Sequence, residues 1–308
     1  MARPDAPLPT RDGVGPSCFV LPAVGPATIA DCLVERFPDI PVAEWTHRMD
    51  VGEVVDEHGV PVTPARPHRA GLRVFYYRRV EAEARVPFDE VVVYRDEHLV
   101  VADKPHFLPV TPSGRHLQET LLVRLRRRLG LDALAPVHRI DRETAGLVLF
   151  SVDPGSRGAY QRLFATHRIV KRYDCIAPWR DDLAGQRDTR LEDDPAHFMR
   201  MREVDGAPNA HTRIELLERR GAWARYALWP RSGKRHQLRV HAAALGIPIH
   251  GDRIYPVLRP HDTDDLADPL RLVARSLVFE DPVTGAERQF VSDRTLAWPP
   301  DPLGDVHQ

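Results

Sequence analysis

A short polar run near the middle of the chain has the composition of a catalytic loop. Residues 138–144 read His-Arg-Ile-Asp-Arg-Glu-Thr, and six of these seven side chains can form hydrogen bonds. The apolar run that follows, residues 147–150, predicts a buried strand. The polar loop is therefore expected to lie against the core, where a polar group without a partner costs several kcal/mol. Chains usually accept that cost where a site is built, and the loop contains carboxylates that could serve as base or nucleophile.

The same run has a plainer interpretation as a surface loop. Its arginines and carboxylates could form an exposed ion-pair network with little effect on stability. Spacing alone does not separate this interpretation from a functional site, so both stay open at this point.

A second dense stretch, residues 230–246, follows two expected strands. It reads Pro-Arg-Ser-Gly-Lys-Arg-His-Gln-Leu-Arg-Val-His-Ala-Ala-Ala-Leu-Gly, and we expect a helix here. His236 and His241 are five positions apart, which directs two imidazoles at one metal less well than a spacing of four. We therefore expect no metal site.

Four ordered stretches resemble the RluA-type pseudouridine synthase family, and together they span residues 90–292. Residues 138–146 are similar to the signature His-Arg-Leu-Asp-x-x-Thr-Ser-Gly, with Ile140 for leucine and Ala145 for serine. The Lys-x-Tyr pattern at 171–173 is similar to a second family motif, and residues 232–241 are similar to Thr-Gly-Arg-Thr-His-Gln-Ile-Arg-Val-His.

The fourth stretch, residues 103–110, is similar to the family's Asn-Lys-Pro-x-Gly-Leu-x-Val. Here Asp103 replaces the asparagine and Phe107 replaces the glycine. A Lys-Pro turn after a strand is common, so we expect this motif to brace the cleft without taking part in chemistry.

The resemblance implies an isomerase that converts uridine in rRNA or tRNA to pseudouridine without a cofactor. Asp141 falls on the family's catalytic aspartate, and its role as nucleophile or as base is left open. Arg239 falls on the active-site arginine and would lower the pKa of Asp141 and orient it. Tyr173 would stack on the uracil, which has to be flipped out of its RNA.

The resemblance also implies residues that bind the substrate. Arg139 would hold the flipped nucleotide or fill the vacated space, and His138 would fix the loop through hydrogen bonds. Leu272 would supply an apolar wall, although an ordinary core leucine is an alternative. The full set of expected substrate-binding residues is Arg139, His138, Leu272, Lys234, Arg235 and Gln237.

Two other functions remain possible. One is an RNA-binding or assembly factor that keeps the fold without catalysis. The other is a hydrolase or phosphoryl-transfer enzyme that uses Asp141 as nucleophile with a divalent metal, although no acidic cluster lies near Asp141 in the sequence.

The composition agrees with a cytoplasmic protein. Its net charge gives no overall positive field that would attract RNA, so any RNA binding has to rely on local clusters of basic residues. The chain has 308 residues, 43% of them hydrophobic, and a net charge of −1. Three cysteines without metal-ligand spacing indicate neither disulfides nor zinc, and no apolar run reaches membrane length. We expect a monomer that binds RNA and no membrane.

The predicted architecture is α+β. A mixed, mostly antiparallel central sheet with flanking helices and a central cleft is expected over residues 81–295, as the resemblance implies. Residues 26–80 predict two helices and a small sheet, and they resemble an S-four-type RNA-binding domain loosely. Residues 1–25 are expected to be an extended arm, 178–210 a loop-like insertion and 296–308 a flexible tail.

A run of four arginines among residues 124–128 has two interpretations. It could grip phosphates, or it could be the solvated face of a helix expected over residues 119–129.

Overall fold

The structure is a computed structural model that describes residues 6–79, 83–114, 116–183, 185–259 and 265–300. The chain divides into two compact units. The first contains the described residues of Met1–Ala84, Pro112–Gln118 and Val123–Asp132, and the second contains the remainder. No helix among the described residues is long and apolar enough to cross a membrane.

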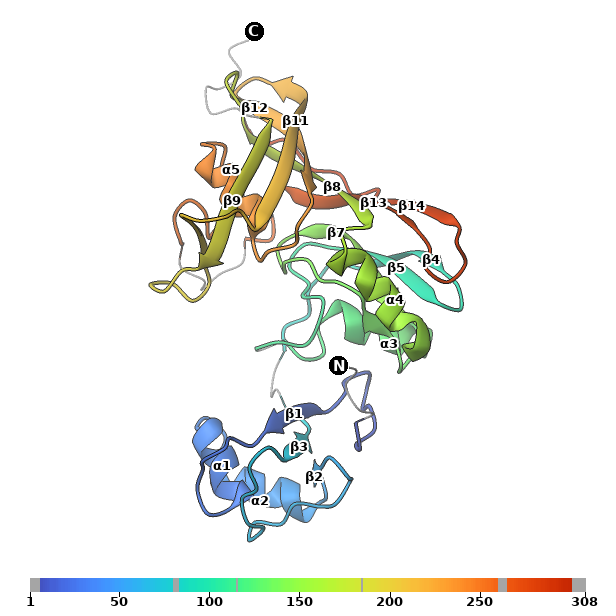
Figure 1. The fold of residues 1–308 in the computed structure, drawn as a ribbon, viewed down its shortest axis with the longest axis vertical. Coiled ribbons are helices and arrows are strands. Elements are labelled where there is room, and N and C mark those ends of the chain that lie inside the picture. Colours follow the sequence, from blue (N-terminus) through green and yellow to red (C-terminus); the bar gives the residue numbers. More distant parts are fainter. Residues whose placement is uncertain (1–5, 80–82, 115, 184, 260–264, 301–308) are drawn as a thin grey trace. The chain divides into compact units, whose positions relative to one another are not determined.

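The first unit packs two helices against a small antiparallel sheet (Figure 1). The helices are α1 (Ile29–Arg36) and α2 (Val42–Asp50), and Thr28 caps α1 by accepting the N–H of Asp31. The sheet has the order β1-β3-β2 and consists of β1 (Ser17–Val20), β3 (Arg73–Tyr76) and β2 (Val54–Asp56). The two helices predicted here are confirmed.

One expectation for the first unit needs correction. The extended arm predicted for residues 1–25 contains β1, which pairs with β3. Arg48 of α2 is buried and bonds Glu44 and the carbonyl of Tyr77. That arginine therefore supports the fold, and RNA binding by this unit stays a prediction.

Helix α3 (Leu121–Leu129) carries the arginine run. Arg126 donates to the carbonyl of Gly13, and Arg127 donates to the side chain of Gln118. At least these two arginines therefore contribute to packing in the first unit.

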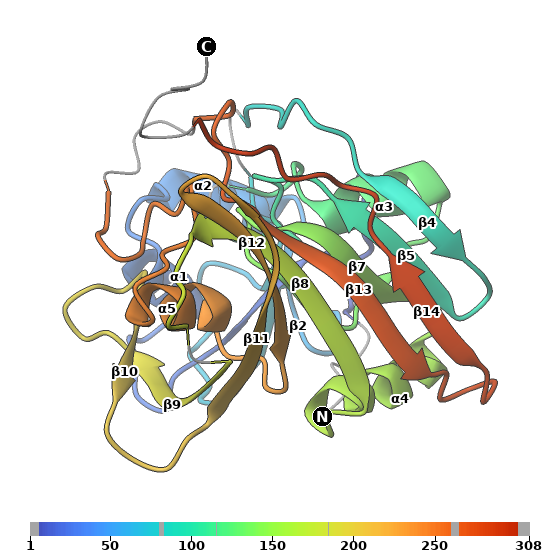
Figure 2. The same ribbon diagram turned by 90° about the horizontal axis from the view of Figure 1, so that it is seen from above.

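The second unit is built on an eleven-stranded sheet, shown from two directions in Figures 1 and 2. The order along its main path is β10-β9-β11-β12-β8-β13-β7-β5-β4, with β14 paired to β13 and β6 paired to β7. Among the strands of the described residues, only β7 and β13 pair in parallel. The predicted mixed, mostly antiparallel sheet is therefore confirmed. The strands are β4 (Val91–Arg95), β5 (Leu99–Lys104), β6 (Ala135–Pro136), β7 (Ala145–Ser151), β8 (Ile169–Pro178), β9 (Gln186–Asp193), β10 (Met201–Val204), β11 (Ala210–Arg220), β12 (Trp223–Pro230), β13 (Leu272–Glu280) and β14 (Glu287–Val291).

Two helices flank this sheet. Helix α4 (Pro154–Ala165) contacts β7 and is capped by Asp153, which accepts the N–H groups of Gly155 and Ser156. Helix α5 (Gln237–Ala244) lies against β10, β11 and β12.

The region predicted to be a loop-like insertion, residues 178–210, is instead part of the sheet. It contains β9 and β10, and β9 pairs with β11. Its charged side chains pair with one another across the strands, as Arg187 does with Glu203. Strands with so many charges lack the apolar alternation by which a strand is recognised in a sequence.

The described part of the predicted tail is packed. Leu296 is 6% exposed and belongs to a core cluster with Ala145, Ile176 and Val273. Residues 301–308 lie outside the described part, so flexibility there stays a prediction.

The parallel pair β7–β13 is closely packed at Gly146. Gly146 has a φ of +109°, and a Cβ added there would lie 2.4 Å from the carbonyl oxygen of Ala274. The two strands can approach each other at this point because the residue has no side chain.

We predict that Gly146→Ala destabilises the second unit by roughly 2–4 kcal/mol, because both the backbone angle and the neighbouring backbone oppose a Cβ. Gly285→Ala is the control, since its φ is also positive, +72°, but no atom lies within 4 Å of the added carbon. Urea denaturation measures both variants. Equal losses would contradict a specific requirement for close strand approach.

Candidate active site

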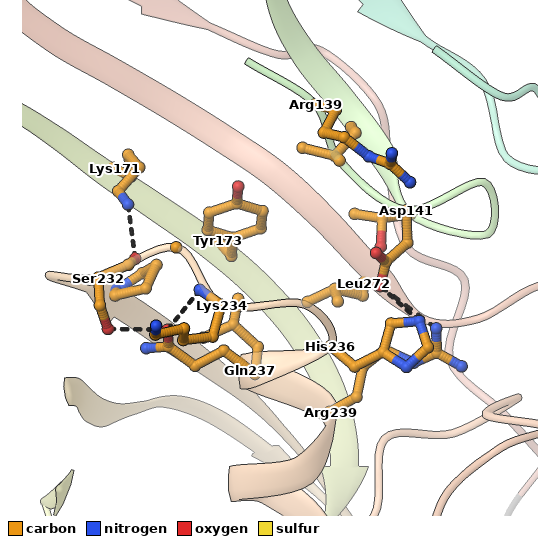
Figure 3. Close-up of a pocket in the computed structure, with 15 residues that line it drawn as sticks. Arg139, Asp141, Lys171, Tyr173, Ser232, Lys234, His236, Gln237, Arg239 and Leu272 are labelled. Carbon is orange, nitrogen blue, oxygen red and sulfur yellow. Dashed lines mark hydrogen bonds and ion pairs between the residues drawn. The ribbon is translucent and has the colours of Figure 1, made fainter. Parts of the chain in front are cut away.

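A pocket in the second unit collects residues from the two motif stretches and two strands (Figure 3). It contains about 500 Å³ of space not filled by atoms, part of it open to solvent. We call it the central pocket. Its lining consists of Arg139, Ile140, Asp141, Thr144, Lys171, Tyr173, Pro230, Ser232, Gly233, Lys234, His236, Gln237, Leu238, Arg239 and Leu272.

Side chains of the 103–110 motif bind the backbone of the polar loop that precedes β7. Lys104 is fully buried, and its Nζ donates to the carbonyl oxygens of Pro105 and Arg142 at 2.9 and 3.0 Å. Nδ1 of His106 donates to the carbonyl of Glu143 at 2.6 Å. Two side chains thus fix the backbone directly after Asp141, which is the bracing expected of this motif.

Arg239 is the cation closest to Asp141. Its Nη1 lies 3.3 Å from Oδ2 of Asp141, and its side chain is 1% exposed. Its Nε and Nη2 are both bound by the carboxylate of Asp252, at 2.8 and 2.7 Å. Asp252 also accepts the N–H groups of Ile254 and Tyr255. The guanidinium is therefore fixed on one side and presents its remaining nitrogen to Asp141.

The surroundings of Asp141 keep it ionised. Burial by itself would raise its pKa, but His236, Arg239 and Arg139 outweigh burial and lower the pKa below its ordinary value. His236 lies 3.9 Å away, and burial lowers its own pKa. Arg239 and Arg139 are therefore the cations that stabilise the carboxylate at neutral pH.

Tyr173 and Leu272 provide the apolar part of the pocket next to Asp141 (Figure 3). Leu272 is 2% exposed. Burial and the nearby Asp141 raise the pKa of Tyr173, so its phenol is neutral. None of the described residues bonds the Tyr173 hydroxyl. The pocket thus joins an ionised carboxylate to a flat apolar surface.

One residue predicted to bind the substrate also holds the structure together, and its contact with substrate stays a prediction. Gln237 lines the pocket, but its amide bonds Ser232, the backbone N–H of Lys234, the carbonyl of His211 and Thr212. These contacts fix the loop at residues 231–236.

Two further predicted residues lie outside the lining of the central pocket. His138 accepts the N–H of Leu149 and stacks on Phe164 at 4.3 Å, so it fixes the loop as expected. Burial lowers its pKa to about 3, so it is neutral and suited to accept this bond. Arg235 bonds Asp193 and the carbonyls of Phe198 and Arg200.

Several pocket residues were not predicted as site residues. His236 precedes α5 with a left-handed φ of 53° and bonds the hydroxyl of Tyr255, so it lies outside the helix on which we expected it. Lys171 donates to the carbonyl of Ser232 at 2.7 Å, and burial lowers its pKa to about 8. Lys171 belongs to the Lys-x-Tyr pattern, and this motif could have identified it as a site residue.

His241 does not face the pocket. Its two ring nitrogens bond the hydroxyls of Thr189 and Thr212, each at 2.9 Å.

Three cations that line the pocket or adjoin its lining residues in sequence have no side-chain hydrogen bond or ion pair among the described residues. Arg139 and Lys234 line it, and Arg231 is next to the lining residues Pro230 and Ser232. Their free guanidinium and ammonium groups could bind phosphate oxygens.

Residues 98–244 match the family model described as RNA pseudouridylate synthase. The ribosomal large subunit pseudouridine synthase D of Xylella fastidiosa is 30% identical over 232 residues, which cover 72% of this chain and 69% of that protein. The tRNA pseudouridine synthase C of Vibrio cholerae is 32% identical over 214 residues, which cover 63% of this chain and 86% of that protein.

A solved structure agrees with this assignment. The human RNA pseudouridylate synthase domain containing 4 is similar with a TM-score of 0.52 and 27% identity, covering 66% of this chain and 87% of that one. The chain belongs to the RluA-type RNA pseudouridine synthases, isomerases that convert uridine in RNA to pseudouridine.

We predict that Lys104→Met destabilises the protein by about 2–3 kcal/mol, because two buried carbonyls lose their donor. Burial lowers the pKa of Lys104 to about 7, although Glu143 and Asp141 pull it upward. The unfolded lysine, with a pKa near 10.4, then binds more protons than the folded one between about pH 7 and 10. The stability of wild type relative to Lys104→Met should therefore rise from pH 7 to 9, by at most about 1.4 kcal/mol per pH unit.

Urea denaturation at pH 7, 8 and 9 measures this difference. Lys234→Met is the matched control, because Lys234 is exposed and unpaired among the described residues. The same pH dependence in both variants would show that Lys104 is not the group that titrates.

Proposed function

We propose that this protein converts particular uridines of rRNA or tRNA to pseudouridine and that Asp141 is its catalytic carboxylate. The observation that carries the proposal is the ionised Asp141 in the central pocket, 3.3 Å from a guanidinium that Asp252 holds in place. Relatives named for large-subunit rRNA and for tRNA support these RNA classes as substrates.

The reaction requires a group placed at the junction of base and sugar. The N1–C1′ bond breaks, the uracil turns, a C5–C1′ bond forms, and the hydrogen of C5 leaves as a proton while N1 gains one. Asp141 would act on the sugar side of this junction as nucleophile or as base. Arg239 would keep it ionised for either role.

The remaining pocket residues suit an extruded base. Leaving an RNA stack costs a flipped base a few kcal/mol, which contacts in the pocket have to offset. Tyr173 offers a ring to stack on the uracil, and Leu272 offers an apolar wall. Arg139, Arg231 and Lys234 would bind the phosphates on either side of the flipped nucleotide.

The proposal predicts that Asp141→Asn abolishes isomerisation while RNA binding persists. The measurement is the release of tritium from RNA transcribed with uridine labelled at C5, because that hydrogen is lost when the new bond forms. Asparagine keeps the size of the side chain and removes its charge, so at least a ~10³-fold loss of rate is expected for a catalytic carboxylate.

Asp268→Asn is a control, since Asp268 is a half-exposed carboxylate that pairs with His250 and Arg271. Wild-type rates in Asp141→Asn would exclude Asp141 as the catalytic group. RNA binding by the wild type without any tritium release, on tRNA and rRNA alike, would favour an RNA-binding factor instead.

A further inference from the structure

The loop between β9 and β10, residues 194–200, presents an aromatic side chain to solvent. Phe198 is 86% exposed and Met199 is 41% exposed. A single exposed apolar side chain is ordinary on a protein surface. Phe198 differs because the backbone of its loop is bound by two residues, Arg235 and Tyr255, that adjoin or contact residues lining the central pocket.

Arg235 makes the first of two connections between this loop and the central pocket. Its Nη2 donates to the carbonyls of Phe198 and Arg200 at 3.3 and 3.0 Å. Arg235 itself stands between Lys234 and His236, which both line the pocket. The loop is therefore attached at the pocket rim.

Tyr255 makes the second connection. Its hydroxyl accepts the N–H of Met201 at 2.7 Å and bonds Nδ1 of His236 at 3.0 Å. The start of β10 is thereby linked to a residue that lies 3.9 Å from Asp141. A ring carried on a backbone fixed twice would lose little freedom when it binds a ligand.

The acidic residues at the end of β9 and the one acidic residue of the loop all have partners. Glu192 pairs with Arg190 at 2.8 Å, and Asp193 pairs with Arg235 at 2.7 Å. Asp194 accepts the N–H of Ala196. The exposed tip presents His197, Phe198 and Met199, whose rings and thioether suit the face of a base better than a phosphate.

We propose that Phe198, with Met199 beside it, stacks on an unpaired base that neighbours the uridine held in the central pocket. This inference rests on the proposed function, because it takes the pocket to hold a flipped uridine. Aromatic side chains commonly hold single-stranded bases in this manner. The enzyme would consequently prefer target uridines in loops or single strands over those flanked by paired nucleotides.

Steady-state tritium release on transcribed tRNA and rRNA tests the proposal. Phe198→Ala should raise KM about tenfold, the scale of one lost base stack, with kcat little changed. Phe198→Trp should keep the wild-type KM because it keeps a ring. Val283→Ala is the control, since Val283 is an exposed apolar residue, 42% exposed, on the turn between β13 and β14.

An unchanged KM in Phe198→Ala would overturn the stacking proposal while leaving the proposed function intact. A lower molecular mass of Phe198→Ala than of wild type in sedimentation would also overturn it, in favour of contact with a second copy of the chain.

A crosslinking experiment tests the contact between Phe198 and RNA without relying on turnover. RNA containing 4-thiouridine is photo-crosslinked to the Asp141→Asn protein, which is then digested with trypsin. The peptide of residues 191–200 should carry crosslinked nucleotide and should lose it in the Asp141→Asn, Phe198→Ala double variant. RNA that crosslinks elsewhere but never to this peptide would contradict the proposal.

Discussion

The active site depends on one buried ion pair, between Arg239 and Asp252. Both side chains are 1% exposed, and a pair so far from water gains little net stability against the cost of desolvating it. Its effect is on geometry. Asp252 binds two nitrogens of the guanidinium and is itself held by backbone N–H groups, so the third nitrogen faces Asp141 at 3.3 Å, with Glu143 next at 3.8 Å. An arginine without this anchor could adopt many rotamers and would orient Asp141 poorly.

The sheet brings the remaining parts of the site to this pair. Strands β12, β8, β13 and β7 are neighbours in that order, although they are far apart in the sequence. β12 ends at Pro230 and leads into the loop before α5, β8 carries Tyr173, and β13 begins with Leu272. β7 follows the loop that contains Asp141. Each strand therefore delivers one side of the central pocket, and Gly146 allows the last two to pair closely.

Much of this could be predicted from the sequence because the informative residues are consecutive. The polar loop before an apolar strand and the stretch from 230 to 246 stand out locally, and the structure places Asp141 and Arg239 beside each other. The partner of Arg239 could not be assigned in this way, since the role of Asp252 depends on the path of the chain after α5. The backbone of Phe107 could not be predicted either. It has a φ of +65° at a position where the family has glycine, and no local sequence pattern predicts that conformation for a phenylalanine.

The most direct test of the account is a map of pseudouridine in all cellular RNA, made with and without the gene. Chemical labelling with reverse-transcription stops would locate each modified uridine. We expect at least one site in rRNA or tRNA to disappear without the gene, to return with the wild-type protein, and to stay absent with Asp141→Asn. Restoration of the site by Asp141→Asn would contradict the central role of this carboxylate, and a map that never changes would contradict the proposed activity.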